Sequence, residues 1–233
     1  MNYSDFELLQ LQAYALYVHD ANNRLLRVNE SDFDDPAPRF FLARTVAGNI
    51  WRIRYDLPDD LATELERLAA TEPVVHDLHE PPYHIAKYTE WLHQHAPLIN
   101  TDTGPAYYLP ELDPPTGTVT VKPENMTLLQ TNYPYTLSTL DERAPVVVVV
   151  EHGVAVAACY TARSTTRVAE AGVYTIETYR GHGYAAETVR GWAEAIRATS
   201  RVPLYSTSWA NKASQAVAMK LGAVQYGVDF SIT

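Results

Sequence analysis

Residues 180–185, with the sequence Arg-Gly-His-Gly-Tyr-Ala, form a glycine-containing turn between a β-branched and aromatic stretch and a stretch with helical periodicity. The small residues Gly181, Gly183 and Ala185 let a ligand come close to the backbone. At the start of a helix the first N–H groups lack partners within the helix, and the helix dipole adds positive potential. Arg180 adds a permanent positive charge. These residues therefore predict a site for a pyrophosphate or a similar anion.

The spacing of this turn, Arg-x-x-Gly-x-Ala, differs from that of the two common nucleotide-binding loops. It is neither the Gly-x-Gly-x-x-Gly of dinucleotide-binding folds nor the Gly-x-x-x-x-Gly-Lys-Ser/Thr of a P-loop. The spacing therefore disfavours a dinucleotide or a nucleoside triphosphate as the bound anion.

The elements that position the turn follow from the periodicity of the second half of the chain. Strands are predicted at residues 145–150, 153–160 and 169–176, then a helix at 185–199, a strand at 203–207, a helix at 212–221 and a last strand at 225–232. A helix between two strands of one sheet predicts a parallel βαβ crossover. The anion site is therefore expected where the third strand meets the first of these helices.

The first half has a less regular pattern. Two hairpins are predicted, from residues 13–19 with 24–29 and from 39–45 with 50–55, followed by a helix that begins at Pro58 and a second helix at 85–95. Five prolines and glycines in residues 105–117 predict a linker. We therefore expect two domains, residues 1–118 and residues 119–233.

Composition and charge limit the class of protein. The chain has no run of 18 apolar residues, no signal-peptide pattern at its start and a single cysteine, Cys159, in an apolar strand. We therefore expect a cytoplasmic protein without a membrane partner, with Cys159 as a buried thiol. Residues 1–118 hold 8 basic and 19 acidic residues, a net charge of −11, whereas residues 119–233 hold 10 and 9, a net charge of +1. The acidic half predicts no nucleic-acid partner and favours a cationic ligand.

The second half resembles the GNAT superfamily of N-acetyltransferases. Residues 180–185 match the pyrophosphate loop of that family, Arg/Gln-x-x-Gly-x-Gly/Ala, and residues 204–207 match a strand that diverges from the strand beside the cofactor. Residues 220–222, Lys-Leu-Gly, match the family's ending of the following helix. The residues that the resemblance places at the acyl-CoA are Val173, Tyr174, Thr175, Arg180, Gly181, His182, Gly183, Tyr184, Ala185, Asn211 and Ser214.

The resemblance implies an α+β protein. Residues 119–233 would have the GNAT fold, a mixed sheet with helices on both faces and a V-shaped gap between two parallel strands, preceded by a smaller α+β N-terminal domain. It also implies direct transfer of an acetyl group from acetyl-CoA to a primary amine of a small molecule or a protein, without a metal. A homo-oligomer is compatible with this interpretation. Asn211 and Ser214 also suit the start of a helix, as N-cap and N3 residues.

Three residues are candidates for proton transfer. Glu170 and Glu177 lie on or beside the cofactor strand, and either carboxylate could accept the proton of the amine, directly or through water. The two glutamates are seven residues apart and would point to opposite faces of a regular strand. The family's general-acid tyrosine corresponds to Ala218, so Tyr226, Ser214 or water would protonate the leaving thiolate.

Two other functions remain open. The missing tyrosine favours a non-catalytic acyl-CoA-binding sensor or interaction module. Residues 76–84 contain three histidines, Asp77 and Glu80, which suggests a metal-dependent enzyme in the first half, but their spacing matches no zinc template. We therefore expect no metal site.

Overall fold

The computed structural model describes residues 3–30 and 34–233, and the chain divides into two compact units. Unit 1 comprises Met1–Tyr107, Ser206–Asn211 and Gln225–Thr233, and unit 2 comprises Tyr108–Tyr205 and Lys212–Val224. The predicted boundary near residue 118 therefore falls inside unit 2, and the unit with the N-terminus is not the smaller one. The difference arises because the C-terminal strand pairs with a strand of the first half, a partnership that is not visible in sequence order.

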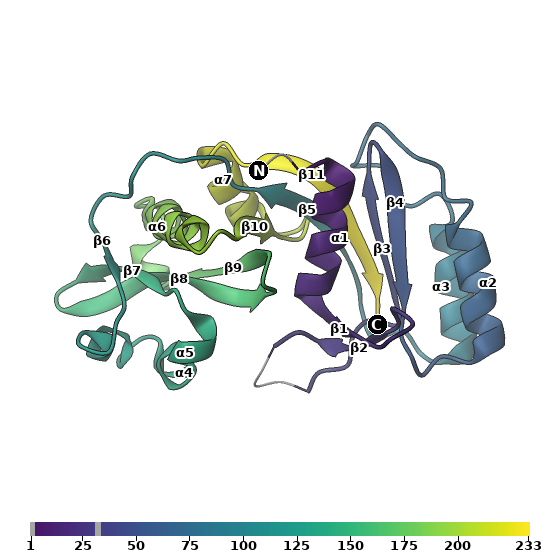
Figure 1. Ribbon diagram of the computed structural model, residues 1–233, viewed down its shortest axis with the longest axis horizontal. Helices are drawn as coiled ribbons and strands as arrows, with labels where there is room; N and C mark the ends of the chain where they lie inside the picture. Colours follow the sequence, from purple (N-terminus) through teal and green to yellow (C-terminus); the bar gives the residue numbers. More distant parts are fainter. Residues whose placement is uncertain (1–2, 31–33) are drawn as a thin grey trace. The chain divides into compact units, whose positions relative to one another are not determined.

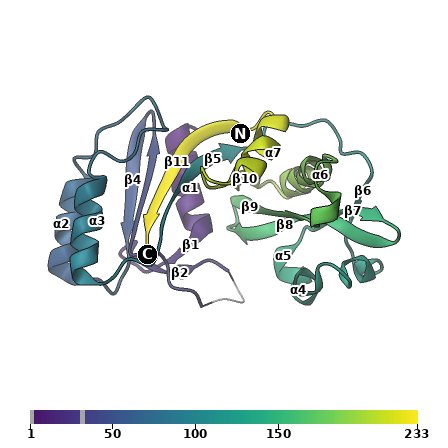
Figure 2. The ribbon, with the colours of Figure 1, turned by 180° about the vertical axis from the view of Figure 1, so that it is seen from behind.

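Unit 1 contains a sheet with helices packed against it (Figures 1 and 2). Its elements are α1 (Asp5–Leu16), β1 (Tyr17–His19), β2 (Leu25–Val28), β3 (Phe40–Thr45), β4 (Gly48–Ile53), α2 (Asp59–Ala69), α3 (Ile85–His95), most of β5 (Thr101–Tyr108) and most of β11 (Val224–Ile232). The strand order is β4-β3-β11-β5, and β3 is antiparallel to both of its neighbours. β1 and β2 form a separate antiparallel ribbon. The predicted hairpin of β3 and β4 and both predicted helices are confirmed.

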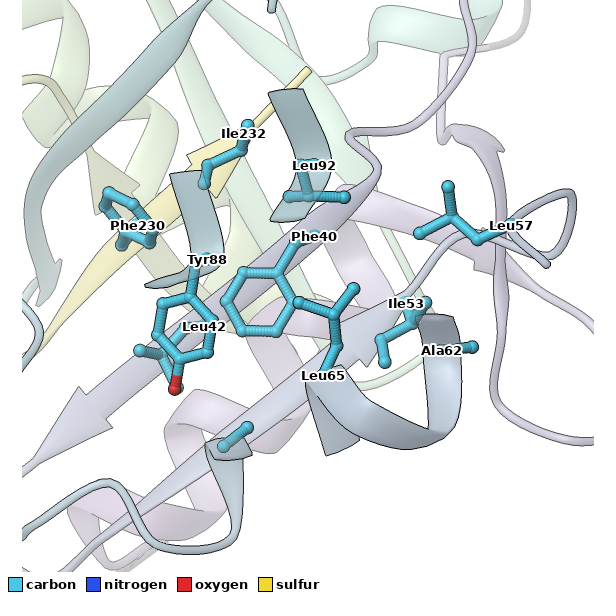
Figure 3. Close-up of a cluster of buried hydrophobic side chains, with 11 residues drawn as sticks. Phe40, Leu42, Ile53, Leu57, Ala62, Leu65, Tyr88, Leu92, Phe230 and Ile232 are labelled. Atoms are coloured by element: carbon cyan, nitrogen blue, oxygen red, sulfur yellow. The ribbon is translucent and has the colours of Figure 1, made fainter. Parts of the chain in front are cut away.

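Both faces of β3 are covered, and all six of its residues are buried. Phe40 and Leu42 point toward α2 and α3 and pack with Leu65 and Tyr88, as Figure 3 shows. On the opposite face the ring of Phe41 meets Tyr17 edge to face, with 5.2 Å between the ring centroids. Successive side chains of β3 therefore point to opposite faces of the sheet, as the geometry of a strand requires.

Helix α1 replaces the first strand of the predicted hairpin at residues 13–29, so that prediction was wrong over most of its first strand. The Ser4 hydroxyl accepts a hydrogen bond from the Glu7 N–H at 3.3 Å, and the Glu7 carboxylate accepts one from the Ser4 N–H at 2.8 Å. This reciprocal pair is a capping box, which fixes the start of a helix. The Ser-x-x-Glu pattern is visible in the sequence and carries this information.

The predicted linker at residues 105–117 was wrong at its start, because β5 extends to Tyr108. Gly104 serves a close approach of two backbones rather than a turn. A Cβ atom at Gly104 would lie 1.8 Å from the carbonyl oxygen of Thr207. The Thr207 N–H donates to the carbonyl of Pro105 at 3.3 Å, so this proline accepts a hydrogen bond within the extended pair.

Unit 2 also contains sheet strands, and helices cover both of their faces (Figure 1). Its elements are β6 (Thr118–Thr120), η1 (Met126–Leu129), α4 (Pro134–Ser138), α5 (Leu140–Arg143), β7 (Val147–Glu151), β8 (Val154–Ser164), β9 (Val168–Thr175), η2 (Glu177–Tyr179), α6 (Tyr184–Ala198), most of β10 (Val202–Ser206) and α7 (Lys212–Lys220). The strand order is β10-β9-β8-β7-β6, with β10 parallel to β9 and the remaining neighbours antiparallel. Helix α6 packs on one face, and η1 and α5 pack on the other. The predicted α+β class with a mixed sheet is confirmed.

Cys159 is fully buried in β8, as expected for a structural thiol. Burial raises the pKa of this thiol well above its usual value. A thiol without a charge cannot act as a nucleophile at neutral pH. In the part of the chain that the structure describes, no helix has the length and apolar character needed to cross a bilayer.

Candidate active site

The predicted anion loop connects η2 to α6. Gly181 and Gly183 both have φ angles of 84°, in the left-handed region that glycine adopts without a steric penalty. Gly183 is the N-cap residue of α6 and brings no side chain to cap the helix. The first turn of α6 is therefore not covered by a capping side chain, which leaves its N–H groups accessible to an anion.

Two cationic side chains lie beside this loop. The Lys220 ammonium is so close to Gly183 that a Cβ atom placed there would lie 2.6 Å from Nζ. Arg180 donates from Nε to the carbonyl of Thr175 at 3.3 Å, and its guanidinium lies 5.9 Å from the centre of the Tyr174 ring. Sequence reasoning used Lys220 only as part of a helix-ending pattern and did not predict its place beside the loop.

The side chains of His182 and Tyr184 stabilise the loop itself. A ring nitrogen of His182 lies 3.1 Å from the carbonyl oxygen of Arg180, and its ring stacks on Tyr184 with 5.5 Å between centroids. The Tyr184 hydroxyl donates to Glu151 at 2.6 Å, and this hydrogen bond raises the pKa of the tyrosine. These two side chains thus help to fix the backbone that would meet the anion.

The strand before the loop has one incompletely paired edge. On one side β9 pairs with β8 from Ala169, opposite Ser164, to Thr175, opposite Ala157. On the other side the parallel ladder with β10 covers only Val168 to Glu170, and Glu170 lies opposite Leu204. Residues 171–175 therefore continue beyond the last β10 partner that the structure records, as two diverging strands do. The predicted cofactor residues Val173, Tyr174 and Thr175 all belong to this part of β9.

A buried tyrosine that sequence reasoning missed supports the same segment. The Tyr133 hydroxyl donates to the carbonyl of Tyr174 at 3.0 Å, and the two rings meet edge to face. Burial raises the pKa of Tyr133, so the phenol stays protonated at neutral pH. No local pattern marks this residue, because its partner is 41 positions away.

Glu170 and Glu177 have different surroundings. Glu170 is 3% exposed and points to the same face of β9 as Gly172 and Tyr174. That face carries the Tyr160 ring, since a Cβ atom at Gly172 would lie 2.4 Å from it. Glu177 is exposed at the start of η2, after β9 has ended. The two glutamates therefore do not share a strand, and the expected placement on opposite strand faces does not apply to Glu177.

The candidates for proton donation are buried or paired. Tyr226 lies in β11 within unit 1 and is 1% exposed. Ala218, the position of the family's tyrosine, is 0% exposed on α7. The Ser214 hydroxyl lies 2.7 Å from the hydroxyl of Tyr205, which is also buried, and this pair connects α7 to β10.

Asn211 is exposed directly before α7, and its N–H donates to the Ser208 hydroxyl at 3.2 Å.

The side chains of the histidine-rich segment in the first half contact separate partners and do not converge on one site. His79 packs against Trp209 with 4.1 Å between ring centroids, and His84 Nε2 lies 3.1 Å from the Thr71 hydroxyl. Glu72 accepts hydrogen bonds from the Tyr83 and His84 backbone and from Tyr88. Across residues 3–30 and 34–233, no three His, Cys, Asp or Glu side chains are close enough to hold a metal ion.

Comparisons with known proteins identify the second half. Residues 122–224 match the family model of the acetyltransferase (GNAT) domain. A similar solved structure is a GCN5-related N-acetyltransferase-like protein from Streptococcus suis, with 14% identity over 84% of this chain and 85% of that chain and a TM-score of 0.49. Another is an acetyltransferase of the GNAT family from Novosphingobium aromaticivorans, with 22% identity over 58% of this chain and 65% of that chain and a TM-score of 0.45. No curated protein matches the chain. Residues 122–224 therefore form a domain of the GNAT acetyltransferase family.

Proposed function

We propose that this protein transfers an acetyl group from acetyl-CoA to a primary amine of a small molecule or a protein. The observation that supports this most strongly is the divergence of β9 and β10 after Glu170, which leaves an edge of β9 for an extended ligand. An extended molecule can add to such an edge as an additional strand. The pantetheine arm of acetyl-CoA has two amide groups that suit this pairing.

The loop after β9 would hold the pyrophosphate at the other end of that arm. Gly181 and Gly183 keep the backbone accessible, while Arg180 and Lys220 supply positive charge. Charge-assisted hydrogen bonds of this kind are about twice as strong as neutral ones. The distance along the chain from Thr175 to Gly183 is short, so strand and loop can bind one elongated ligand.

The reaction requires two proton movements. The amine nitrogen attacks the thioester carbonyl, the C–S bond breaks, an amide forms, and the thiolate of coenzyme A leaves with a proton. Glu170 lies at the start of the gap, opposite Leu204, where its carboxylate can accept the amine proton directly or through water. A thiolate with a pKa near 8.5 needs little help from an acid, so water protonates it in this proposal.

A second candidate function is an acyl-CoA-binding module without turnover. Its support is Ala218, which replaces the family's tyrosine and is buried on α7. Both functions require the same binding loop and differ only in the transfer step. The two proposals therefore make the same prediction for acetyl-CoA binding and opposite predictions for thiol release.

Thiol release distinguishes the two functions. We expect purified protein with acetyl-CoA to release free coenzyme A when primary amines are added, and not when matched alcohols are added. Calorimetry on the same preparation measures acetyl-CoA binding. Binding without thiol release from any amine in a broad panel would replace the enzyme by the binding module, and absence of binding would contradict both.

Lys220→Ala is expected to weaken acetyl-CoA binding about tenfold. A hydrogen bond to a charged group contributes about 1.5–3 kcal/mol, and 1.4 kcal/mol corresponds to a factor of ten. The affinity of the variant should also depend less on salt, since one phosphate contact is lost. Lys212→Ala, at the exposed start of the same helix, removes the same charge and should bind like the wild type.

A further inference from the structure

A small cavity in unit 1 has a lining that suits a cation. Its volume is about 210 Å³, and its walls come from the end of α1, from β3, β5 and β11, and from residues 206–208 at and after the end of β10. A water molecule occupies about 30 Å³ in the liquid, so the space equals that of about seven waters. The cavity is therefore large enough for a small organic molecule.

One wall of this cavity is formed by two backbone segments in contact with each other. Ser206–Ser208 lie against the start of β5, where Gly104 allows contact between the two main chains. The Trp209 N–H donates to the carbonyl of Thr103 at 3.0 Å and extends this pairing. Ser206 is also the last residue of β10, the strand that diverges from β9. The lining is thus continuous in the chain with the proposed donor site.

The polar lining is negative or neutral. Asp229 and Asp102 provide carboxylates, and none of the described residues along the cavity is a lysine, an arginine or a histidine. Asp229 lies opposite Ala43 in the pairing of β11 with β3, which places it on the sheet face that carries Phe41. The rings of Phe41 and Tyr17 provide the apolar side of the cavity. A cation with an apolar body is complementary to such a lining.

Asp229 is held in place from inside the protein. Gln12 on α1 is 0% exposed, and its Nε2 donates to the Asp229 carboxylate at 2.9 Å. The Oε1 oxygen of Gln12 is buried without a hydrogen-bond partner among the described residues. The hydrogen bond from this buried amide fixes the carboxylate in place. Preorganised acceptors of this type favour an ammonium donor.

We propose that this cavity binds the acceptor of the acyl transfer as its ammonium ion, and that Asp229 selects the positive charge. The inference rests on the proposed function and specifies its substrate class: small primary amines with an aryl or alkyl body. Asp229 acts in binding and positioning. The bound ammonium must then lose its proton before its nitrogen can attack a thioester.

Direct binding tests the proposal without turnover. The probe is 2-phenylethylamine, and its neutral counterpart is 2-phenylethanol; both are titrated into the full-length protein at pH 7 by calorimetry or ligand-observed NMR. We expect the amine to bind at least about tenfold more tightly than the alcohol, the factor that one charge-assisted hydrogen bond gives. Equal binding of both, or no binding of the amine, overturns the proposal.

Variants locate the binding site. Asp229→Asn keeps the shape and removes the charge, so it should lose the preference for the amine, while Asp113→Asn, an exposed carboxylate elsewhere, should retain it. Ser208→Lys places an ammonium at the cavity and should also abolish amine binding, which guards against a folding defect in Asp229→Asn. Amine binding that survives both changes places the amine elsewhere and overturns the proposal.

The outcomes separate this inference from the proposed function. An amine that binds through Asp229 but never releases coenzyme A leaves the cavity assignment standing and contradicts the acyltransferase. Thiol release with an unchanged KM for the amine in Asp229→Asn contradicts the cavity assignment and leaves the acyltransferase standing. The expected result is a KM for the amine raised about tenfold, with a smaller change in kcat.

Discussion

The Gly183→Glu variant is expected to bind acetyl-CoA at least about a hundredfold more weakly than the wild type, a loss of roughly 2.7 kcal/mol. Gly183 has a φ angle of 84°, a conformation that side-chain-bearing residues rarely adopt. A Cβ atom there would lie 2.6 Å from Lys220 Nζ, so the new carboxylate would pair with this ammonium. The variant thereby places a negative charge in the position proposed for the pyrophosphate and removes access to the backbone.

Gly153→Glu is the matched control for this experiment. Gly153 has a φ angle of 81° in the turn between β7 and β8, and a Cβ atom there would meet no other atom within 4 Å. Both variants therefore have similar backbone strain, and only one has a carboxylate at the loop. Calorimetry with acetyl-CoA and thermal unfolding of both proteins give affinity and stability separately. If the two variants bind acetyl-CoA equally well, the loop does not hold the donor.

Replacing Glu170 by Gln is expected to lower kcat about a hundredfold or more, because general acid–base catalysis contributes roughly 10² to 10⁴ in rate. Glu170 is the last β9 residue with a partner in β10, at the point where the two strands diverge. Glutamine has the same shape, so the KM for acetyl-CoA should stay nearly constant. The acidic limb of the pH profile of kcat/KM should disappear in the variant, since that limb reports protonation of the base.

Glu177→Gln serves as the comparison. Glu177 is exposed in η2 and lies outside β9, so its removal should change kcat no more than about twofold. If Glu177→Gln lowers the rate and Glu170→Gln does not, the roles of the two carboxylates are reversed. An unchanged rate and pH profile in both variants would mean that solvent, and neither glutamate, accepts the proton.

Several elements of the fold were predictable from local sequence. The helix at Ile85–His95 and the hairpin of β3 and β4 have clear periodicity, and β7 to β10, α6 and α7 begin and end within a few residues of the prediction. The short elements β6, η1, α4 and α5 were not predicted. Residues 180–185 were identified because a left-handed glycine conformation and a helix start depend on neighbouring residues only. The capping box that starts α1 also depends only on neighbouring residues, Ser4 and Glu7, but this Ser-x-x-Glu pattern was not used in the prediction.

Other features were not accessible from local sequence. The strand β5 contains Gly104 and Pro105, which usually indicate a turn, and only the contact with Thr207 explains a glycine there. The division of the chain into units also departs from sequence order, because β11 pairs with β3. In both cases the partner strand comes from a distant part of the chain, and periodicity identifies a strand without identifying its partner.

The sequence by itself determined the α+β class, the GNAT domain and the glycine-containing loop at the start of α6, since each depends on residues that are close together in the chain. The tertiary structure decided what surrounds that loop: Lys220 lies beside Gly183, the ladder of β9 with β10 ends at Glu170, and buried Gln12 holds Asp229. Glu170 and Leu204 are far apart in sequence, and Gln12 is 217 positions from Asp229. Such neighbours are set by the packing of helices and strands against one another, because burial of their apolar faces brings distant polar groups together.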